Sequence, residues 1–189
     1  AFLTAEAELP VRTTKFVRRP VSPLIFRRIR PRPTTGDVWT FDGTPARTVL
    51  LGAREVPMNP CSVAFEIRPT AATNAWRSVL CRNGWQEGVE VALTPDGRVE
   101  ASWRGGPRNN ALNVSCVGTT PLALNAWSRV RVVVDGDKLR LFVNAKEENT
   151  RAVPAARVYG NARYRLGGGA PGTVPFTGEI RSLVFGPPE

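Results

Sequence analysis

The stretch that most limits the fold of this chain is WSRVRVVVDGDKLRLFVNAKE, residues 127–147. It alternates apolar and polar residues on both sides of a single turn. A period of two with β-branched side chains is typical of strands that bury one face. The central Asp135-Gly136-Asp137 supplies the positive φ that a tight hairpin requires. We therefore predict two antiparallel strands whose buried face consists of alternate aliphatic residues: Val130, Val132, Val134, Leu139, Leu141 and Val143.

Similar short segments follow one another from residue 37 onward. CSVAFEIRP (61–69) and GVEVALTPDGRVEASW (88–103) alternate in the same way and are bounded by Gly, Pro or Asn-Gly signals. No segment shows sustained helical periodicity, and the 189 residues include 17 Gly and 17 Pro. We expect ten to twelve short strands and an all-β fold, a two-sheet antiparallel jelly-roll sandwich over residues 37–189.

Residues 1–36 have a different composition and form a separate unit, a basic Arg/Pro-rich arm. Five prolines between Pro10 and Pro33 exclude a long helix or a central strand. The arm contains eight basic residues and only two acidic ones, Glu6 and Glu8, so it carries most of the net charge of +10. Alone it cannot bury its apolar side chains, so we expect an extended arm that is disordered or lies on another surface. The residues expected to contact a partner are Arg12, Lys15, Arg18, Arg19, Leu24, Ile25, Phe26, Arg27, Arg28, Arg30 and Arg32.

This arm is the strongest functional signal in the sequence. Arginine presents a planar fork that suits phosphate and carboxylate, so we expect the arm to bind RNA or an acidic protein surface. The first hypothesis is a structural, non-catalytic subunit of a large assembly, namely a ribonucleoprotein such as a mitochondrial ribosome. A subunit of a respiratory or other multiprotein complex is the second hypothesis. The alternative to both is that the arm is a tail without a binding function. The longest uncharged run, 109–128, contains four Asn, so no membrane insertion is expected.

Several kinds of chemistry are excluded or disfavoured. The chain has no histidine, which removes Ser-His and Cys-His nucleophile pairs and His-bearing zinc sites. Glycoside hydrolysis needs two carboxylates facing one bond, whereas Glu87 and Glu90 would point to opposite faces of a strand. We expect no enzymatic activity. The three cysteines, Cys61, Cys81 and Cys116, lack C-x-x-C spacing, so we expect buried free thiols, with one disulfide and a spare thiol as the alternative.

The C-terminal part of the chain carries a family resemblance. Trp127, the Val143-Asn144 turn, Leu166-Gly167-Gly168 and the closing FTGEIRSLV (176–184) resemble, in this order, laminin-G-like members of the concanavalin A-like lectin/glucanase superfamily. Upstream, SVAFEIRP (62–69) and LTPDGRVEASW (93–103) resemble earlier strands of that family. The resemblance covers about residues 37–187 and implies a jelly roll of two curved sheets. It implies little about activity, because the fold hosts lectins, hydrolases and interaction modules. The Glu-x-Asp-x-x-Glu pattern of the superfamily's hydrolases is absent.

The resemblance also supports a rival hypothesis, a secreted glycan-binding lectin domain. Sugars pack on exposed aromatic rings, and the candidate residues for that role are Trp85, Trp103 and Asn109, with Trp76 also near a predicted loop. Tryptophans that fill the core are the alternative. Asn113-Val114-Ser115 is a glycosylation sequon, and a secreted form should show either a glycan there or a disulfide.

The resemblance suggests calcium as a candidate ion, because laminin-G-like domains often hold one calcium ion at the rim of a sheet. The candidate ligands are Asp37, Asp42, Asp96, Asp135 and Asp137. Turn chemistry alone also explains these aspartates, since they adjoin glycines. We therefore expect no cofactor.

Overall fold

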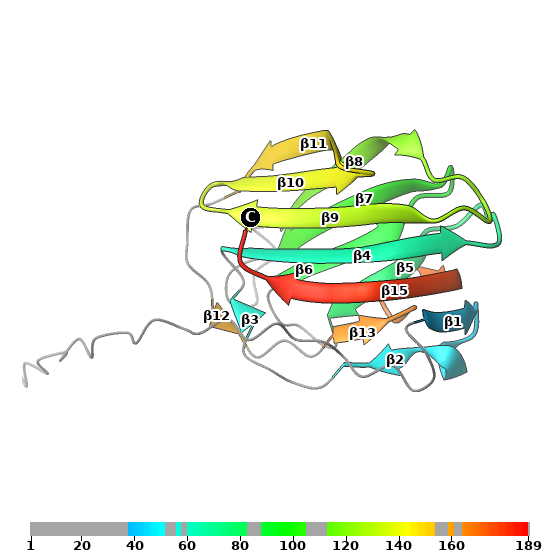
Figure 1. Ribbon diagram of the computed structural model, residues 1–189. Coiled ribbons are helices and arrows are strands. Elements are labelled where there is room, and N and C mark those ends of the chain that lie inside the picture. The colour runs from blue at the N-terminus through cyan, green and yellow to red at the C-terminus, as the bar shows by residue number, and fades with distance from the viewer. Residues whose placement is uncertain are drawn as a thin grey trace, which may run out of the picture.

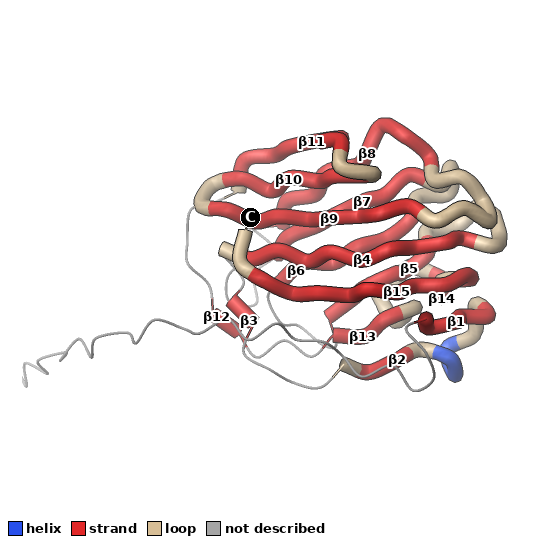
Figure 2. The backbone as a smooth tube through the Cα atoms, viewed as in Figure 1, coloured by secondary structure: helices blue, strands red, loops and turns tan. Residues whose placement is uncertain are grey.

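The computed structural model describes residues 38–51, 56–57, 60–82, 88–104, 113–153, 159–160 and 164–188. This part of the chain is almost entirely β-structure, arranged as two large antiparallel sheets packed face to face, with a separate pair of two-residue strands (Figures 1 and 2). One 3-10 turn, Pro45–Arg47, follows the first strand. The strands are β1 (Val38–Asp42), β2 (Val49–Leu50), β3 (Val56–Pro57), β4 (Cys61–Pro69), β5 (Arg77–Arg82), β6 (Gly88–Leu93), β7 (Arg98–Arg104), β8 (Asn113–Pro121), β9 (Ser128–Asp135), β10 (Lys138–Val143), β11 (Lys146–Ala152), β12 (Tyr159–Gly160), β13 (Tyr164–Leu166), β14 (Val174–Pro175) and β15 (Thr177–Gly186).

The first sheet has six strands in the order β1-β15-β4-β9-β10-β11. The hairpin predicted from residues 127–147 lies in it as β9 and β10, with Val132 opposite Leu141. Its register is the expected one, because the six aliphatic residues of the predicted inner face are buried. The strand next to it, β4, alternates buried and half-buried residues without a break. Alternation on three central strands therefore gives this sheet one apolar face and one polar face.

The second sheet has seven strands, in the order β2-β13-β5-β6-β7-β8, with β14 added in parallel to β5. Its inner face includes Val91, Val99 and Trp103, and the side chain of Trp103 is wholly buried. A single hydrophobic cluster, which runs from Trp39 to Phe185, joins the two inner faces. Each large aliphatic or aromatic side chain in it stabilises the fold by roughly 1.5–3 kcal/mol, so the sandwich has an extensive core.

Two glycines of the family-like motifs stand where no larger residue fits. Gly167 has φ +84, and a Cβ there would lie 2.1 Å from the ring of Phe41. Gly178 has φ +144, and its Cβ would lie 2.3 Å from the carbonyl oxygen of Arg68. Both positions therefore need glycine for its conformation and for the close approach of a neighbour.

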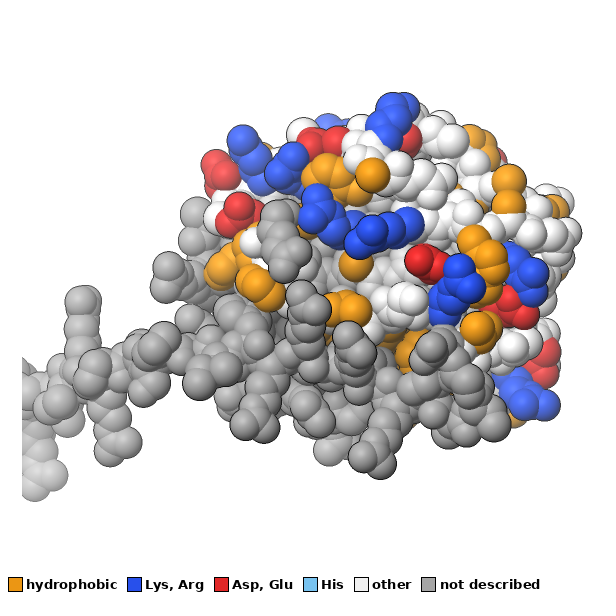
Figure 3. Space-filling view, in the orientation of Figure 1, with side chains coloured by type: hydrophobic (Ala, Val, Ile, Leu, Met, Phe, Trp, Pro, Cys, Tyr) orange, Lys and Arg blue, Asp and Glu red, His pale blue; other side chains and the backbone are white. Residues whose placement is uncertain are grey.

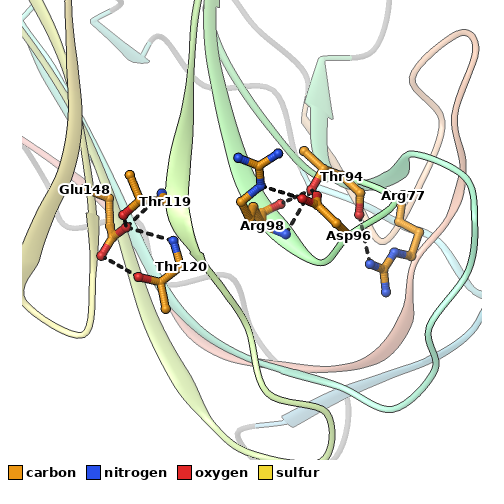
Figure 4. Close-up of polar contacts among 7 residues, drawn as sticks. All are labelled: Arg77, Thr94, Asp96, Arg98, Thr119, Thr120 and Glu148. Carbon is orange, nitrogen blue, oxygen red and sulfur yellow. Dashed lines mark hydrogen bonds and ion pairs between the residues drawn. The ribbon is translucent and has the colours of Figure 1, made fainter.

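A carboxylate joins the two sheets at one edge of the sandwich (Figure 4). Glu148 of β11 accepts hydrogen bonds from the backbone N–H groups of Thr119 and Thr120 in β8, at 2.8 and 3.0 Å. Both threonine hydroxyls donate to the same carboxylate. Because β11 belongs to one sheet and β8 to the other, Glu148 fastens the sheets to each other where the sandwich would otherwise be open.

The strand number differs from the prediction. The described residues contain fifteen strands rather than ten to twelve. The surplus consists of pairings only two residues long, such as β2, β3, β12 and β14. Two residues are too few to show a period in sequence, so these pairings depend on the neighbouring strand rather than on local pattern.

Candidate functional site

A groove of about 360 Å³ lies on the outer face of the seven-stranded sheet. The strands β6 and β7 form its floor, because their outward positions alternate with the buried ones. Glu90 faces Ser102 across the strand pair, and Ala92 faces Glu100. The resulting surface carries two carboxylates, a hydroxyl and the guanidinium of Arg104.

The two carboxylates of the groove have different environments. Glu90 Oε1 lies 3.2 Å from Nε of Arg82, and its Oε2 lies 3.6 Å from Nε of Arg104. Arginines therefore engage both oxygens of Glu90. Burial raises the pKa of Glu100 above its usual value, the hydroxyl of Ser115 opposes this by hydrogen bonding, and the charge of Glu90 adds to it. The groove thus combines one ion-paired carboxylate with one that is easier to protonate.

One rim of the groove is formed by Trp76 and the tight turn 170–173. Trp76 is 37% exposed, whereas the other described tryptophans are less exposed. Such exposure is unusual for tryptophan, which has the largest side chain and is highly buried on average. Its carbonyl accepts a hydrogen bond from the N–H of Val174 at 2.8 Å. The turn is closed by the N–H and the hydroxyl of Thr173, which both donate to the carbonyl of Ala170. An aromatic surface therefore borders a polar floor.

The opposite rim lies on β8, where Asn113 and Ser115 line the groove. Asn113 is exposed and is the acceptor residue of the predicted sequon. A glycan on Asn113 would therefore stand beside the groove.

Most of the site residues predicted from sequence lie outside the described residues. This holds for the whole set in the arm, from Arg12 to Arg32, and for Trp85 and Asn109, so their roles stay predictions. Trp103 is a correction: its ring is wholly buried beneath the groove, where it fills the core and cannot contact a sugar. The alternative that tryptophan serves packing is right for this residue.

The predicted calcium ligands are dispersed among several turns. Asp42 accepts hydrogen bonds from Thr44, and Asp96 lies 2.7 Å from Arg98 and also bonds Thr94 (Figure 4). Asp135 and Asp137 flank the β9–β10 turn, and Asp37 lies outside the described residues. Across the described ranges, no three acidic, cysteine or histidine residues converge in a way that would hold a metal ion.

The cysteines are free and buried, as expected. Cys61 lies in β4, Cys81 in β5 and Cys116 in β8. Burial raises the pKa of Cys61 to about 12 and that of Cys116 to about 11, so both thiols stay protonated at neutral pH.

The groove residues Glu100, Ser102 and Arg104 were not identified from sequence. The alternation in RVEASWR does place all three on the outward face. Only the pairing of β6 with β7 shows that they share a surface with Glu90. In the part of the chain that the structure describes, no helix is long and apolar enough to span a bilayer.

Comparison with known proteins identifies the fold. The laminin-G family model described as the concanavalin A-like lectin/glucanases superfamily matches residues 42–185. No curated protein sequence matches the chain significantly. Solved structures with a similar fold include mouse laminin alpha1 chain domains LG4-5, with 15% identity and a TM-score of 0.61. That match covers 77% of this chain but only 40% of the laminin chain.

Two further structures extend the comparison. The native heptameric SAP-like pentraxin from Limulus polyphemus matches with 15% identity and a TM-score of 0.56, over 78% of this chain and 74% of the pentraxin. The CBM40 of the Ruminococcus gnavus IT-sialidase, solved with bound alpha2,3 sialyllactose, matches with 16% identity and a TM-score of 0.55. This match covers 73% of this chain and 88% of the CBM40. At such identities the likeness concerns the fold alone.

Proposed function

The chain belongs to the concanavalin A-like lectin/glucanases superfamily, and from this premise we propose that its sandwich is a non-catalytic module that binds a glycan in the groove of the seven-stranded sheet. The observation that carries the proposal is the exposed ring of Trp76 beside a floor of convergent polar groups. A pyranose ring has an apolar face of C–H groups that packs on an aromatic ring, while its hydroxyls need both donors and acceptors. The groove offers both kinds of surface.

Its size and composition suit an oligosaccharide. Pockets for small ligands usually enclose about 300–1,000 Å³, and this groove encloses about 360 Å³. Glu100 and Ser102 accept hydrogen bonds from sugar hydroxyls, whereas Arg104 donates them. The CBM40 with bound sialyllactose has the same fold and binds a sugar. Laminin-G-like domains commonly mediate protein or glycan interactions and are commonly extracellular, which supports an extracellular location.

The binding experiment uses Trp76→Ala. Calorimetric titration of the full chain with a panel of neutral and acidic oligosaccharides should identify a ligand whose affinity falls about tenfold or more in this variant, as for a central aromatic contact. Leu124→Ala is the matched control, because Leu124 is an exposed apolar residue outside the groove. Its affinity should equal that of the wild type. Equal affinity in Trp76→Ala, or no glycan ligand at all, would refute the proposal.

Catalysis is the closest rival, because Glu90 and Glu100 share one groove. A nucleophile or general base needs an oxygen free to react, and arginines engage both oxygens of Glu90. We therefore expect no turnover when the full chain is incubated with β-glucans, arabinans and sialosides. Hydrolysis that disappears in Glu100→Gln, while folding is unchanged, would show that the domain is an enzyme.

The hypothesis of a ribonucleoprotein or mitochondrial subunit depends on residues 1–36 alone. Its only support is the charge and proline content of that arm. The glycan-binding proposal has the support of the groove and of the family, so it is the one that we prefer. Glycosylation of Asn113 is the simplest observation that would distinguish a secreted protein from an intracellular subunit. A disulfide cannot serve for this purpose, because the described cysteines form none.

A further inference from the structure

The outer face of the six-stranded sheet, on the side of the sandwich opposite to the groove, contains a second hollow. It forms where small side chains stand side by side: Ser62 faces Gly186, and Ala64 faces Val184. On the other side of β4, Arg131 stands opposite Ala64 and Arg129 stands opposite Glu66. Long side chains next to short ones leave a hollow of about 390 Å³ between them.

The same two arginines also line a smaller hollow of about 230 Å³, together with Phe142 and Ala145. Arg129 and Arg131 therefore stand between two depressions and are accessible from both. Figure 3 shows Lys and Arg side chains over this part of the face, where β9 and β10 run. Among the described residues, no carboxylate lies within ion-pair distance of Arg129.

Aromatic rings hold the arginines of this face in place. The guanidinium of Arg131 lies 4.5 Å from the ring centroid of Phe142, and that of Arg140 lies 4.9 Å from the same ring. Stacking uses the flat face of a guanidinium and so restricts its orientation. Arg131 is thus oriented before any ligand arrives, which lowers the entropic cost of binding.

The hollow also contains a hydrogen-bond acceptor of fixed position. Glu66 Oε2 accepts a hydrogen bond of 2.6 Å from Nε of Arg181. Arg181 in turn stacks over Trp127 at 4.1 Å. The charge of Glu66 is therefore balanced, while its other oxygen can accept a hydrogen bond from a ligand. Ser182, which lines the hollow from the bulge in β15, adds an exposed hydroxyl.

We propose that this hollow binds a carboxylate-bearing sugar residue of the uronic acid type. Its carboxylate is held by Arg129 next to the positive charge of Arg131, and its ring hydroxyls are held by Glu66 and Ser182. The site is independent of the groove around Trp76. A domain with both sites has a ligand surface on each sheet.

Three observations favour this ligand class. The volume lies in the range of small-ligand pockets. The hollow lies in the middle of a sheet, where the backbone groups of β4 and β9 already pair with each other, so a peptide strand cannot add to it. The carboxylate of Glu66 needs a hydrogen-bond donor as its partner, and the hydroxyls of a sugar ring next to a single carboxylate supply one. A single negative charge next to hydroxyl groups matches all of these features.

The test is calorimetric titration of the full chain with trigalacturonic acid. Its methyl ester, which has the same rings without the charge, and inorganic phosphate at equal ionic strength are the comparison ligands. We expect the acid to bind and the ester and phosphate to bind at least about tenfold more weakly, since a charge-assisted bond to arginine distinguishes the acid from the ester. Equal binding of ester and acid, equal binding of phosphate and acid, or no binding of the acid would each overturn the proposal.

Variants locate the site. Arg129→Gln should weaken binding of the acid about tenfold, and Ala64→Leu should weaken it at least as much by filling the floor without changing charge. Arg151→Gln removes an exposed charge outside the hollow and should leave affinity within about twofold, because exposed charges contribute little. Trp76→Ala should also leave it unchanged, which separates this site from the groove. Melting curves verify that the variants are folded. If Ala64→Leu does not fold, Arg129→Gln is the decisive variant, because Arg129 is exposed and its replacement should not disturb the core. Unchanged affinity in folded Arg129→Gln would overturn the proposal.

Discussion

At the scale of single residues, the sandwich depends on polar side chains whose partners are distant in sequence. Glu148 is the clearest example, because its carboxylate receives four hydrogen bonds from two neighbouring threonines of the other sheet. Its side chain is only 2% exposed. The hydroxyl and N–H of Thr119, with further bonds from Thr120 and Lys146, lower the pKa of Glu148 from 4.5 to about 2. Such a carboxylate stabilises the fold only while it is ionised.

This arrangement predicts a specific acid sensitivity. The folded pKa lies below the unfolded one, so the contribution is complete above about pH 4.5 and is lost as pH falls towards 2. Glu148→Gln should lower the free energy of unfolding at pH 7 by about 1.5–3 kcal/mol, and the difference from wild type should vanish near pH 2. Urea titrations at several pH values measure this. Glu147→Gln, on the same strand but more exposed, should show a much smaller effect, and an equal effect would contradict the assignment.

At the scale of elements, one hairpin turn of the sandwich holds a residue in a disfavoured backbone conformation. The β10–β11 turn holds Asn144 at φ +50 and Ala145 at φ +69. Two consecutive positive φ values are typical of a two-residue hairpin turn, for which Asn-Gly is preferred. Asn144 suits its position, and its side chain also accepts a hydrogen bond from the N–H of Arg129 at 2.9 Å. Ala145 does not, because a Cβ is disfavoured in this conformation.

Replacing the strained alanine should therefore stabilise the protein. Ala145→Gly relieves the steric cost of positive φ but adds flexibility to the unfolded chain, so we expect a net gain of about 0.5–1 kcal/mol. Ala152→Gly, at an extended position in the adjacent β11, should instead cost about 0.5–1 kcal/mol. Thermal unfolding of the two variants gives both values. A loss of stability in Ala145→Gly would mean that the turn is not strained.

At the scale of the whole molecule, the sandwich has one core and two outer faces. Among the described residues, one hydrophobic cluster that runs from Trp39 to Phe185 joins the two sheets. The two outer faces carry different chemistry. The seven-stranded sheet has a groove with Trp76, Glu90 and Glu100, whereas the six-stranded sheet presents arginines. The two faces therefore differ in the ligand that we propose for each.

The basic, proline-rich composition of residues 1–36 leads to a separate prediction. Deleting residues 1–35 should leave the free energy of unfolding unchanged, as measured by urea titration. If the arm binds RNA, the full chain should bind single-stranded RNA with about four to six phosphate contacts and a log–log salt slope of roughly −3 to −4, which the deletion abolishes.

Two triple variants of the arm distinguish the type of partner. Arg27/Arg28/Arg30→Ala should remove binding to RNA, whereas Leu24/Ile25/Phe26→Ala should remove binding to a protein groove. If the full chain and the deletion variant bind RNA equally, the ribonucleoprotein hypothesis is wrong.

The fold and the site differ in how far the sequence determined them. Alternation along β9 and β10 was enough to assign their inner face, because burial of one face depends only on a local period of two. It did not show that Val133 and Phe142, on the opposite face, are buried as well. The glycines of Leu166-Gly167-Gly168 and FTGEI likewise pointed to the family from sequence alone. Neither the groove around Trp76 nor the hollow beside Arg129 could be predicted from the sequence in this way. Glu90 and Glu100 share a groove only because β6 pairs with β7, and Arg129 and Arg131 border a hollow only because Ser62, Ala64 and Gly186 stand beside them. Strand register brings these residues together, and register is set by contacts across the whole sheet, so only the tertiary structure decided where the two proposed sites lie.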